Sequence, residues 1–223
     1  MKSKIHQCQK KNKYTMSKSI IIIALLVVTG FTQAQTNFEK GMTKAFEIWK
    51  NGNTDDAENM FERIAKAEPK EWLPSYYIAQ INSLKSWNEK DETILKAQLD
   101  KAQEHLDLAM TISEDNAELI VMQAQILTNW VVFDGMTYGM KYGGKISELY
   151  SKALELEPEN PRATFCKADW NLNSAKYFGK DTAPFCEDIE TSVKLFDTFK
   201  PESEFHPNWG KERAEFVAKE CKA

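Results

Sequence analysis

Residues that interrupt helices are scarce in this sequence. Its 223 residues include nine Gly and seven Pro, which excludes collagen-like and linker-like chains. The period-two alternation typical of β-strands is absent, and apolar residues recur at spacings of three and four, which predicts an all-α protein. Hydrophobic residues make up 42% of the chain, which is too many for a disordered protein and enough for one domain.

Catalytic and metal-binding motifs are lacking as well. Only His105 and His206 follow residue 34, and neither belongs to an HExxH or Cys/His pattern. Residues 139–145 have the GxxxxGK spacing of a phosphate-binding loop, but Ile146 stands where a magnesium-binding hydroxyl is required. We therefore interpret this stretch as a Gly-rich loop between helices, and we predict no enzyme activity, no cofactor and no metal.

Acidic residues are absent from the first 34 positions, which contain six Lys. Residues 35–223 consequently hold 23 basic and 33 acidic residues. Nucleic acids and anionic membranes both present phosphate, so we predict that this acidic body binds neither of them unaided.

Only one segment of the chain is a long apolar run. Residues 20–28 read IIIIALLVV, with Lys18 before them and Ala34 shortly after, which is typical of a secretory signal peptide over residues 1–34. A membrane-spanning helix needs about 18–20 apolar residues, so we expect no stable membrane insertion after cleavage. We predict a periplasmic or secreted chain that starts near Gln35, with Met16 as the true initiator.

Four segments of helical length share one spacing of apolar residues. The clearest pair is DAENMFERIAKAEP (56–69) and GKISELYSKALELEP (144–158), and weaker copies cover 100–116 and 186–201. One position in the preceding helix is Ala in all four cases: Ala45, Ala79, Ala124 and Ala168. A small side chain there permits two helices to cross closely.

This pattern resembles the tetratricopeptide repeat (TPR) family, which pairs antiparallel helices and closes the second with Pro. The resemblance covers residues 38–203 and implies an all-α, right-handed stack of about four helical hairpins, a TPR-like α-solenoid. Residues 204–223 are predicted to form a C-terminal capping helix. The aligned alanines are 34 residues apart in the first interval but 45 and 44 in the next two. We expect the surplus in interhelical insertions at 85–92, 131–145 and 173–183.

The resemblance also implies a concave face, lined by the first helix of each pair, that binds extended chains. We therefore predict a non-catalytic scaffold that binds a protein or peptide partner in the cell envelope. The residues predicted to line this face are Tyr76, Tyr77, Gln80, Met122, Gln125, Asn129, Arg162, Asp169 and Asn173. Packing between repeats is an alternative role for the two tyrosines, and the sequence leaves both roles open.

Aromatic residues in the expected loops suggest a different site. Trp87 lies in a polar segment and Tyr138 and Tyr142 lie in a Gly-rich one, and loops with exposed aromatic residues are often functional. Folding of the Gly-rich segment back over the stack is the alternative. Sugar rings stack on aromatic faces, so an envelope carbohydrate-binding protein is the alternative function.

Three cysteines follow residue 34, and helix geometry favours one pair. If helices over about 184–199 and 207–221 run antiparallel, Cys186 and Cys221 lie level to within roughly 2 Å along the axis. Cys166 is offset from Cys186 by about 10 Å, which is too far for a disulfide. We therefore predict a Cys186–Cys221 disulfide and a free, buried Cys166.

Overall fold

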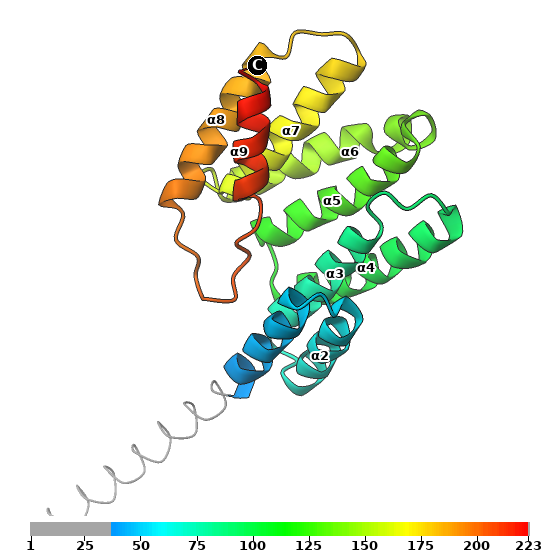
Figure 1. The fold of residues 1–223 in the computed structure, drawn as a ribbon, viewed down its shortest axis with the longest axis vertical. Helices are drawn as coiled ribbons and strands as arrows, with labels where there is room; N and C mark the ends of the chain where they lie inside the picture. Colours follow the sequence, from blue (N-terminus) through cyan, green and yellow to red (C-terminus); the bar gives the residue numbers. More distant parts are fainter. Residues whose placement is uncertain (1–36, 223) are drawn as a thin grey trace, which may run out of the picture.

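The computed structural model describes residues 37–222, and this part of the chain folds into helices and connecting loops (Figure 1). A helical segment at 37–50 is followed by α2 (Thr54–Ala67), α3 (Leu73–Lys85), α4 (Glu92–Ile112), α5 (Ala117–Phe133), α6 (Gly135–Leu156), α7 (Pro161–Tyr177), α8 (Ala183–Thr198) and α9 (Lys211–Glu220). The predicted signal region, with Met16, lies outside the described residues.

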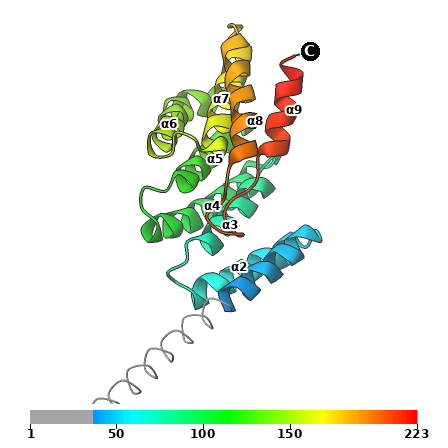
Figure 2. The same ribbon diagram turned by 90° about the vertical axis from the view of Figure 1, so that its left-hand side faces the viewer.

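Consecutive helices pack in pairs and the pairs stack, so the predicted all-α stack of four hairpins with a C-terminal helix is confirmed. Figure 2 shows α2 at one end of the stack and α8 and α9 at the other. Among the described helices, none combines the length and the apolar character needed to cross a membrane.

Polar side chains fix the start of four helices. Asp91, Asn116, Asp134 and Asn160 each accept a hydrogen bond from a backbone N–H in the first turn of the helix that follows. These caps satisfy donors that a helix leaves free at its N-terminus, so they set where α4, α5, α6 and α7 begin.

The expected loop at 131–145 is wrong, because most of this segment is helical. α5 ends at Phe133 and α6 begins two residues later at Gly135, with Asp134 as its cap. The glycines therefore lie inside a helix, and Gly143 faces the Trp170 ring, whose nearest carbon is 3.7 Å from an added Cβ. Much of the surplus sequence lengthens α6 to 22 residues. Residues 86–91 and 178–182 do form the other two connections.

The four aligned alanines are completely buried, as close helix crossings require: Ala45, Ala79, Ala124 and Ala168.

The buried apolar side chains form two clusters that share α5. The N-terminal core joins residues 37–50 with α2, α3 and α4, and it receives Leu119 and Met122 from α5. The C-terminal core joins α6 to α9, and it receives Ile120 and Ala124 from the same helix. Because neighbouring residues of α5 enter different cores, this helix couples the two halves.

Residues 199–210, here called the strap, connect α8 to α9 by a long detour. From the end of α8 the strap extends toward the N-terminal helices, and it then returns to the start of α9 (Figures 1 and 2). Its Phe205 is 7% exposed and belongs to the N-terminal core. The predicted capping helix at 204–223 is therefore shorter than expected. Gly210 has a left-handed φ of 105°, so the helix starts only at Lys211.

The predicted disulfide is confirmed. Cys186 near the start of α8 is bonded to Cys221 just after α9, with a Cα–Cα distance of 5.7 Å. Cys166 is free and buried. Burial raises the pKa of its thiol, which disfavours the reactive thiolate.

Candidate functional site

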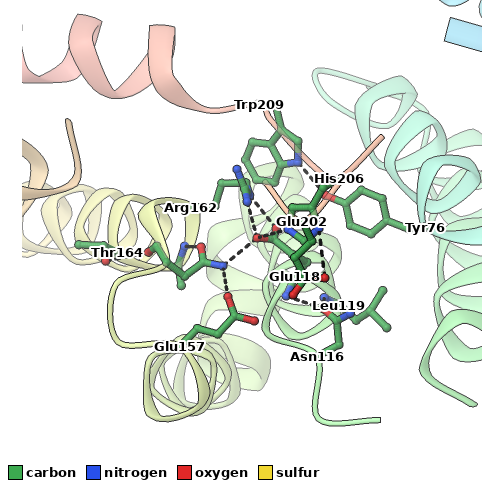
Figure 3. A network of polar contacts seen from close by, with 12 residues as sticks. Tyr76, Asn116, Glu118, Leu119, Glu157, Arg162, Thr164, Glu202, His206 and Trp209 are labelled. Atoms are coloured by element: carbon green, nitrogen blue, oxygen red, sulfur yellow. Dashed lines mark hydrogen bonds and ion pairs between the residues drawn. The ribbon is translucent and has the colours of Figure 1, made fainter. Parts of the chain in front are cut away.

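A buried ion pair joins the starts of α5 and α7 (Figure 3). Arg162 donates from Nε to Oε2 of Glu118 at 2.7 Å and from Nη2 to Oε1 at 2.5 Å. The two side chains are 0% and 1% exposed. Asn160, the cap of α7, also donates to Glu118 Oε1 at 2.7 Å. The pair therefore holds the α5–α6 hairpin against the α7–α8 hairpin.

Glu118 remains ionised although it lies away from solvent. Burial by itself raises the pKa of its carboxyl, but contacts with His206 and Arg162 outweigh that effect and hold the pKa below its usual value. His206 comes from the strap, and its Nε2 lies 3.8 Å from Glu118 Oε1. The strap thus contacts the same carboxylate that orients α5 and α7.

The strap also occupies the face formed by the first helices. Tyr77 donates its hydroxyl to the carbonyl of Phe205 at 2.7 Å, and Trp209 Nε1 donates to the hydroxyl of Tyr76 at 2.7 Å. The Phe205 ring stacks on Phe46 with a centroid distance of 6.0 Å. Burial raises the pKa of both tyrosines, which keeps their hydroxyls protonated.

Most of the predicted concave-face residues are buried, and the strap contacts three of them, Tyr76, Tyr77 and Arg162. Six are buried: Tyr76, Tyr77, Gln80, Met122, Asn129 and Arg162. The packing role describes the two tyrosines in this structure, because strap residues satisfy both hydroxyls. Sequence reasoning missed Phe205 and Trp209. Two aromatic residues around a His-Pro step, between two helices, are the signal that could have found them.

The other predicted residues of this face have structural partners too. Asn129 donates to Ser83 O at 2.7 Å and to Ser86 Oγ at 2.8 Å, which ties α5 to the end of α3. The half-buried Gln125 donates to the Tyr150 hydroxyl at 3.2 Å. Asp169 is half-buried and Asn173 is exposed, and Asn173 donates to the Asp169 backbone carbonyl at 2.8 Å.

A second surface lies at the turn between α3 and α4 and the turn between α5 and α6. We call it the hairpin-tip surface, and its members are Trp87, Val132, Met136, Tyr138, Met140 and Tyr142. Met136 is 80% exposed and Met140 is 93% exposed, one turn apart on α6. Trp87 and Val132 border the same small cleft, whose volume is about 30 Å³.

The aromatic rings of this surface are held in place. Tyr138 lies 4.8 Å from Trp130 and 5.8 Å from Tyr142, as centroid distances, and it donates its hydroxyl to Glu92 at 2.9 Å. The Lys141 ammonium lies 4.8 Å from the centre of the Tyr142 ring. These contacts orient the two tyrosines that the sequence singles out, while the neighbouring thioethers remain open to solvent.

An open groove of about 640 Å³ lies between the end of α4, α5 and α6. Ile120, Leu127 and Leu149 contribute apolar surface to it, and Lys145 and Lys152 are on its rim. The Lys145 ammonium pairs with Glu148 at 2.9 Å, and the Lys152 ammonium pairs with Asp115 at 3.6 Å. Exposed ion pairs are weak, so an anionic ligand can compete for both lysines. Within residues 37–222, no cluster of three or more His, Cys, Asp or Glu side chains could hold a metal ion.

The geometry defines an all-α helical-repeat protein, and comparison with known proteins supports that class. No family model and no curated protein matches the chain. Among solved structures, the chain is similar to the HusA haemophore from Porphyromonas gingivalis, with 22% identity and a TM-score of 0.73. The match covers 83% of this chain and 92% of HusA. This likeness shows a shared fold, whereas membership of the TPR family stays a prediction.

A second similar structure is the MamA RS-1 ArsTM double mutant. It is 14% identical, with a TM-score of 0.47, and the match covers 72% of this chain and 76% of that one.

Proposed function

We propose that this protein is an exported, non-catalytic scaffold that binds a protein partner in the cell envelope through its hairpin-tip surface. The observation that carries the proposal is the exposure of Met136 and Met140 beside fixed aromatic rings. Thioether and aromatic side chains are enriched at protein interfaces, and exposed clusters of them mark interaction sites. The adjacent cleft of about 30 Å³ is too small to enclose a ligand, which favours a broad partner surface.

Export is supported by two independent features. The short apolar run at residues 20–28 is typical of a secretory signal peptide. The Cys186–Cys221 bond is of a kind that persists in oxidising compartments such as the periplasm or the extracellular space.

Quantitative capture from envelope extract tests the binding surface. The double variant Met136→Lys/Met140→Lys should retain the helical circular dichroism. Its affinity for the captured partner should fall at least about tenfold, because forming the complex would bury two charged side chains. Phe216→Lys is the matched control, because Phe216 is half-exposed on α9, away from the tips. Equal capture by the parent and the double variant would contradict the proposal.

The carbohydrate alternative uses the rings of the same surface, so a glycan array run on the same proteins separates the two functions. Glycan binding that is lost with Trp87→Ala and kept in the double Met variant would favour the carbohydrate function. Protein capture that is lost in the double Met variant, without any glycan binding, would favour the scaffold.

Binding of a porphyrin is a second candidate function, and the groove between α4, α5 and α6 favours it. The groove has the size of a ligand site, and its lining combines apolar side chains with two lysines that could pair with porphyrin carboxylates. It also contains the acidic residues Glu114, Asp115 and Glu148, which such a ligand would have to displace from the lysines. HusA, which shares the fold, is named a haemophore. Titration with haemin should then give a saturable absorbance change that Lys145→Glu/Lys152→Glu weakens at least about tenfold. A strictly linear titration would exclude this candidate.

A further inference from the structure

The strap contacts the face formed by the first helices in the way a bound peptide would. Phe205 inserts between aromatic rings of the N-terminal core, stacked on Phe46 and edge-on to Phe38 at 6.1 Å. Its carbonyl accepts a hydrogen bond from Tyr77, and four residues later Trp209 donates to Tyr76. One buried ring, one main-chain acceptor and one side-chain donor are the elements by which helical grooves hold extended segments.

The strap is anchored at its base independently of these contacts. Asp197 at the end of α8 and Lys211 at the start of α9 form an ion pair of 2.7 Å across the two ends of the strap. The Cys186–Cys221 bond holds the far ends of the same two helices together. α8 and α9 therefore stay joined whether or not the strap is seated.

The tip of the strap is lightly held apart from its inserted side chains. Residues 201–204 are exposed and the segment contains no helix, so few backbone hydrogen bonds oppose its release. Its inserted side chains contact residues far away in the sequence: Phe205 meets Tyr77, His206 meets Glu118 and Trp209 meets Tyr76. Because the two ends of the strap lie close together, opening requires only that these contacts break, which costs less free energy than global unfolding.

We propose that the concave face is a peptide-binding site occupied in cis by the strap, and that release of the strap uncovers this site. The ligand class is an extended segment with two aromatic side chains four residues apart around a His-Pro step, as in Phe205-His206-Pro207-Asn208-Trp209. Release exposes Tyr76, Tyr77 and the ring of Phe46, which are the groups that would contact the bound segment. This site is separate from the hairpin-tip surface, so an experiment that contradicts one proposal leaves the other unaffected.

The test uses a fluorescent peptide of residues 199–210 as the probe. A tethered segment has an effective concentration in the millimolar range, so the parent protein should bind added peptide poorly. The variant Phe205→Ser/Trp209→Ser weakens the cis contacts and should bind the peptide at least about tenfold more tightly than the parent. A peptide with alanine at both aromatic positions should lose at least about tenfold in affinity for that variant, and Tyr77→Phe in the variant should weaken binding of the original peptide.

Equally weak binding by the parent and the variant, with circular dichroism and the disulfide intact, would overturn the proposal. If the variant does not fold, native-state hydrogen exchange of the unmodified protein decides the matter. The His206 amide, which donates to Ser203 O at 3.1 Å, should exchange at least about tenfold faster than amides in the middle of α3. Equal rates would show that the strap opens only when the whole protein unfolds, and would overturn the proposal.

Discussion

The two cores of this protein are stabilised by different means. In the N-terminal core, Phe46 contacts the rings of Phe61, Tyr77 and Phe205 at centroid distances of 5.5, 4.7 and 6.0 Å. In the C-terminal core, the last helices bury mostly small side chains: α8 buries Ile189 and Ser192, and α9 buries Ala214, Val217 and Ala218. The disulfide lies at this end. Packing of large aromatic rings stabilises the N-terminal core. A covalent bond adds stability to the terminal helices, which bury few large side chains.

Charge is also handled differently in the two halves. In the N-terminal half, Glu58 meets two partly exposed lysines, Lys85 at 2.6 Å and Lys101. At the entry to the C-terminal half, Glu118 and Arg162 are both fully enclosed. A partly exposed network can be screened by solvent, whereas an enclosed pair cannot lose one partner without leaving a charge unpaired.

The largest effect is expected where the two halves meet. Arg162→Met leaves Glu118 buried without its counter-ion and should lower the free energy of unfolding by about 3–5 kcal/mol. Lys152→Met breaks an exposed pair with Asp115 and should cost at most about 1 kcal/mol. Urea denaturation measures both, and similar losses in the two variants would show that the enclosed pair has no special role.

Removing the disulfide comes next. Cys186→Ser/Cys221→Ser opens a link that spans 35 residues and should cost about 3–4 kcal/mol. Hydrogen exchange should show the loss first in α8 and α9, because these are the helices that the bond joins. Reductant should destabilise the parent by a similar amount and leave the double variant unchanged, and a parent insensitive to reductant would contradict the stabilising role.

A smaller, pH-dependent effect distinguishes the N-terminal network. Burial raises the pKa of Glu58, but hydrogen bonds from Asn82, Lys101 and Lys85 outweigh it and lower the pKa from 4.5 to about 2. A lowered pKa contributes stability above pH 4.5 that is lost as the pH falls toward 2. Allowing for solvent screening of the lysines, the contribution is about 2 kcal/mol. Urea denaturation between pH 6 and about pH 2.5 should show a shallower decline for Glu58→Gln, and parallel curves would contradict this.

The smallest effect concerns the contact between the strap and the N-terminal core. Tyr77→Phe removes one buried hydrogen bond to Phe205 and should cost about 1 kcal/mol in chemical denaturation. Tyr138→Phe removes an exposed hydrogen bond to Glu92 and serves as the control, with a smaller cost. A loss for Tyr77→Phe no larger than experimental error would mean that the strap contact adds nothing to stability.

The parts predictable from the sequence are those governed by helical periodicity. The aligned alanines follow from the spacing of residues along a helix. The Cys186–Cys221 pair follows from the antiparallel packing of α8 and α9, and it is present although α9 starts four residues later than predicted. The helix over 144–158 was predicted, but the N-terminal part of α6 at 135–143 was missed. Glycines weaken helices intrinsically, whereas the Asp134 cap and tertiary packing override that preference.

The sequence did not allow us to predict that the strap covers the face formed by the first helices. A repeat frame places Tyr76 and Tyr77 on the first helices, but it says nothing about a non-periodic segment that returns from far along the chain. Phe205 lies 128 residues from Tyr77, and no local pattern connects them. The exposure of the α6 thioethers could not be predicted either, because the same residues in a loop could have folded back over the stack.

The central claim is that the hairpin-tip surface recognises a partner. Site-specific photo-crosslinking in the envelope fraction of the source cells tests it most directly, with a photoreactive residue in place of Met140 or, as control, of Phe216. We expect a discrete crosslinked protein from position 140. Excess parent protein should compete this product away, and excess Met136→Lys/Met140→Lys variant should not. A yield at position 140 no higher than at position 216, and insensitive to competitor, would contradict it.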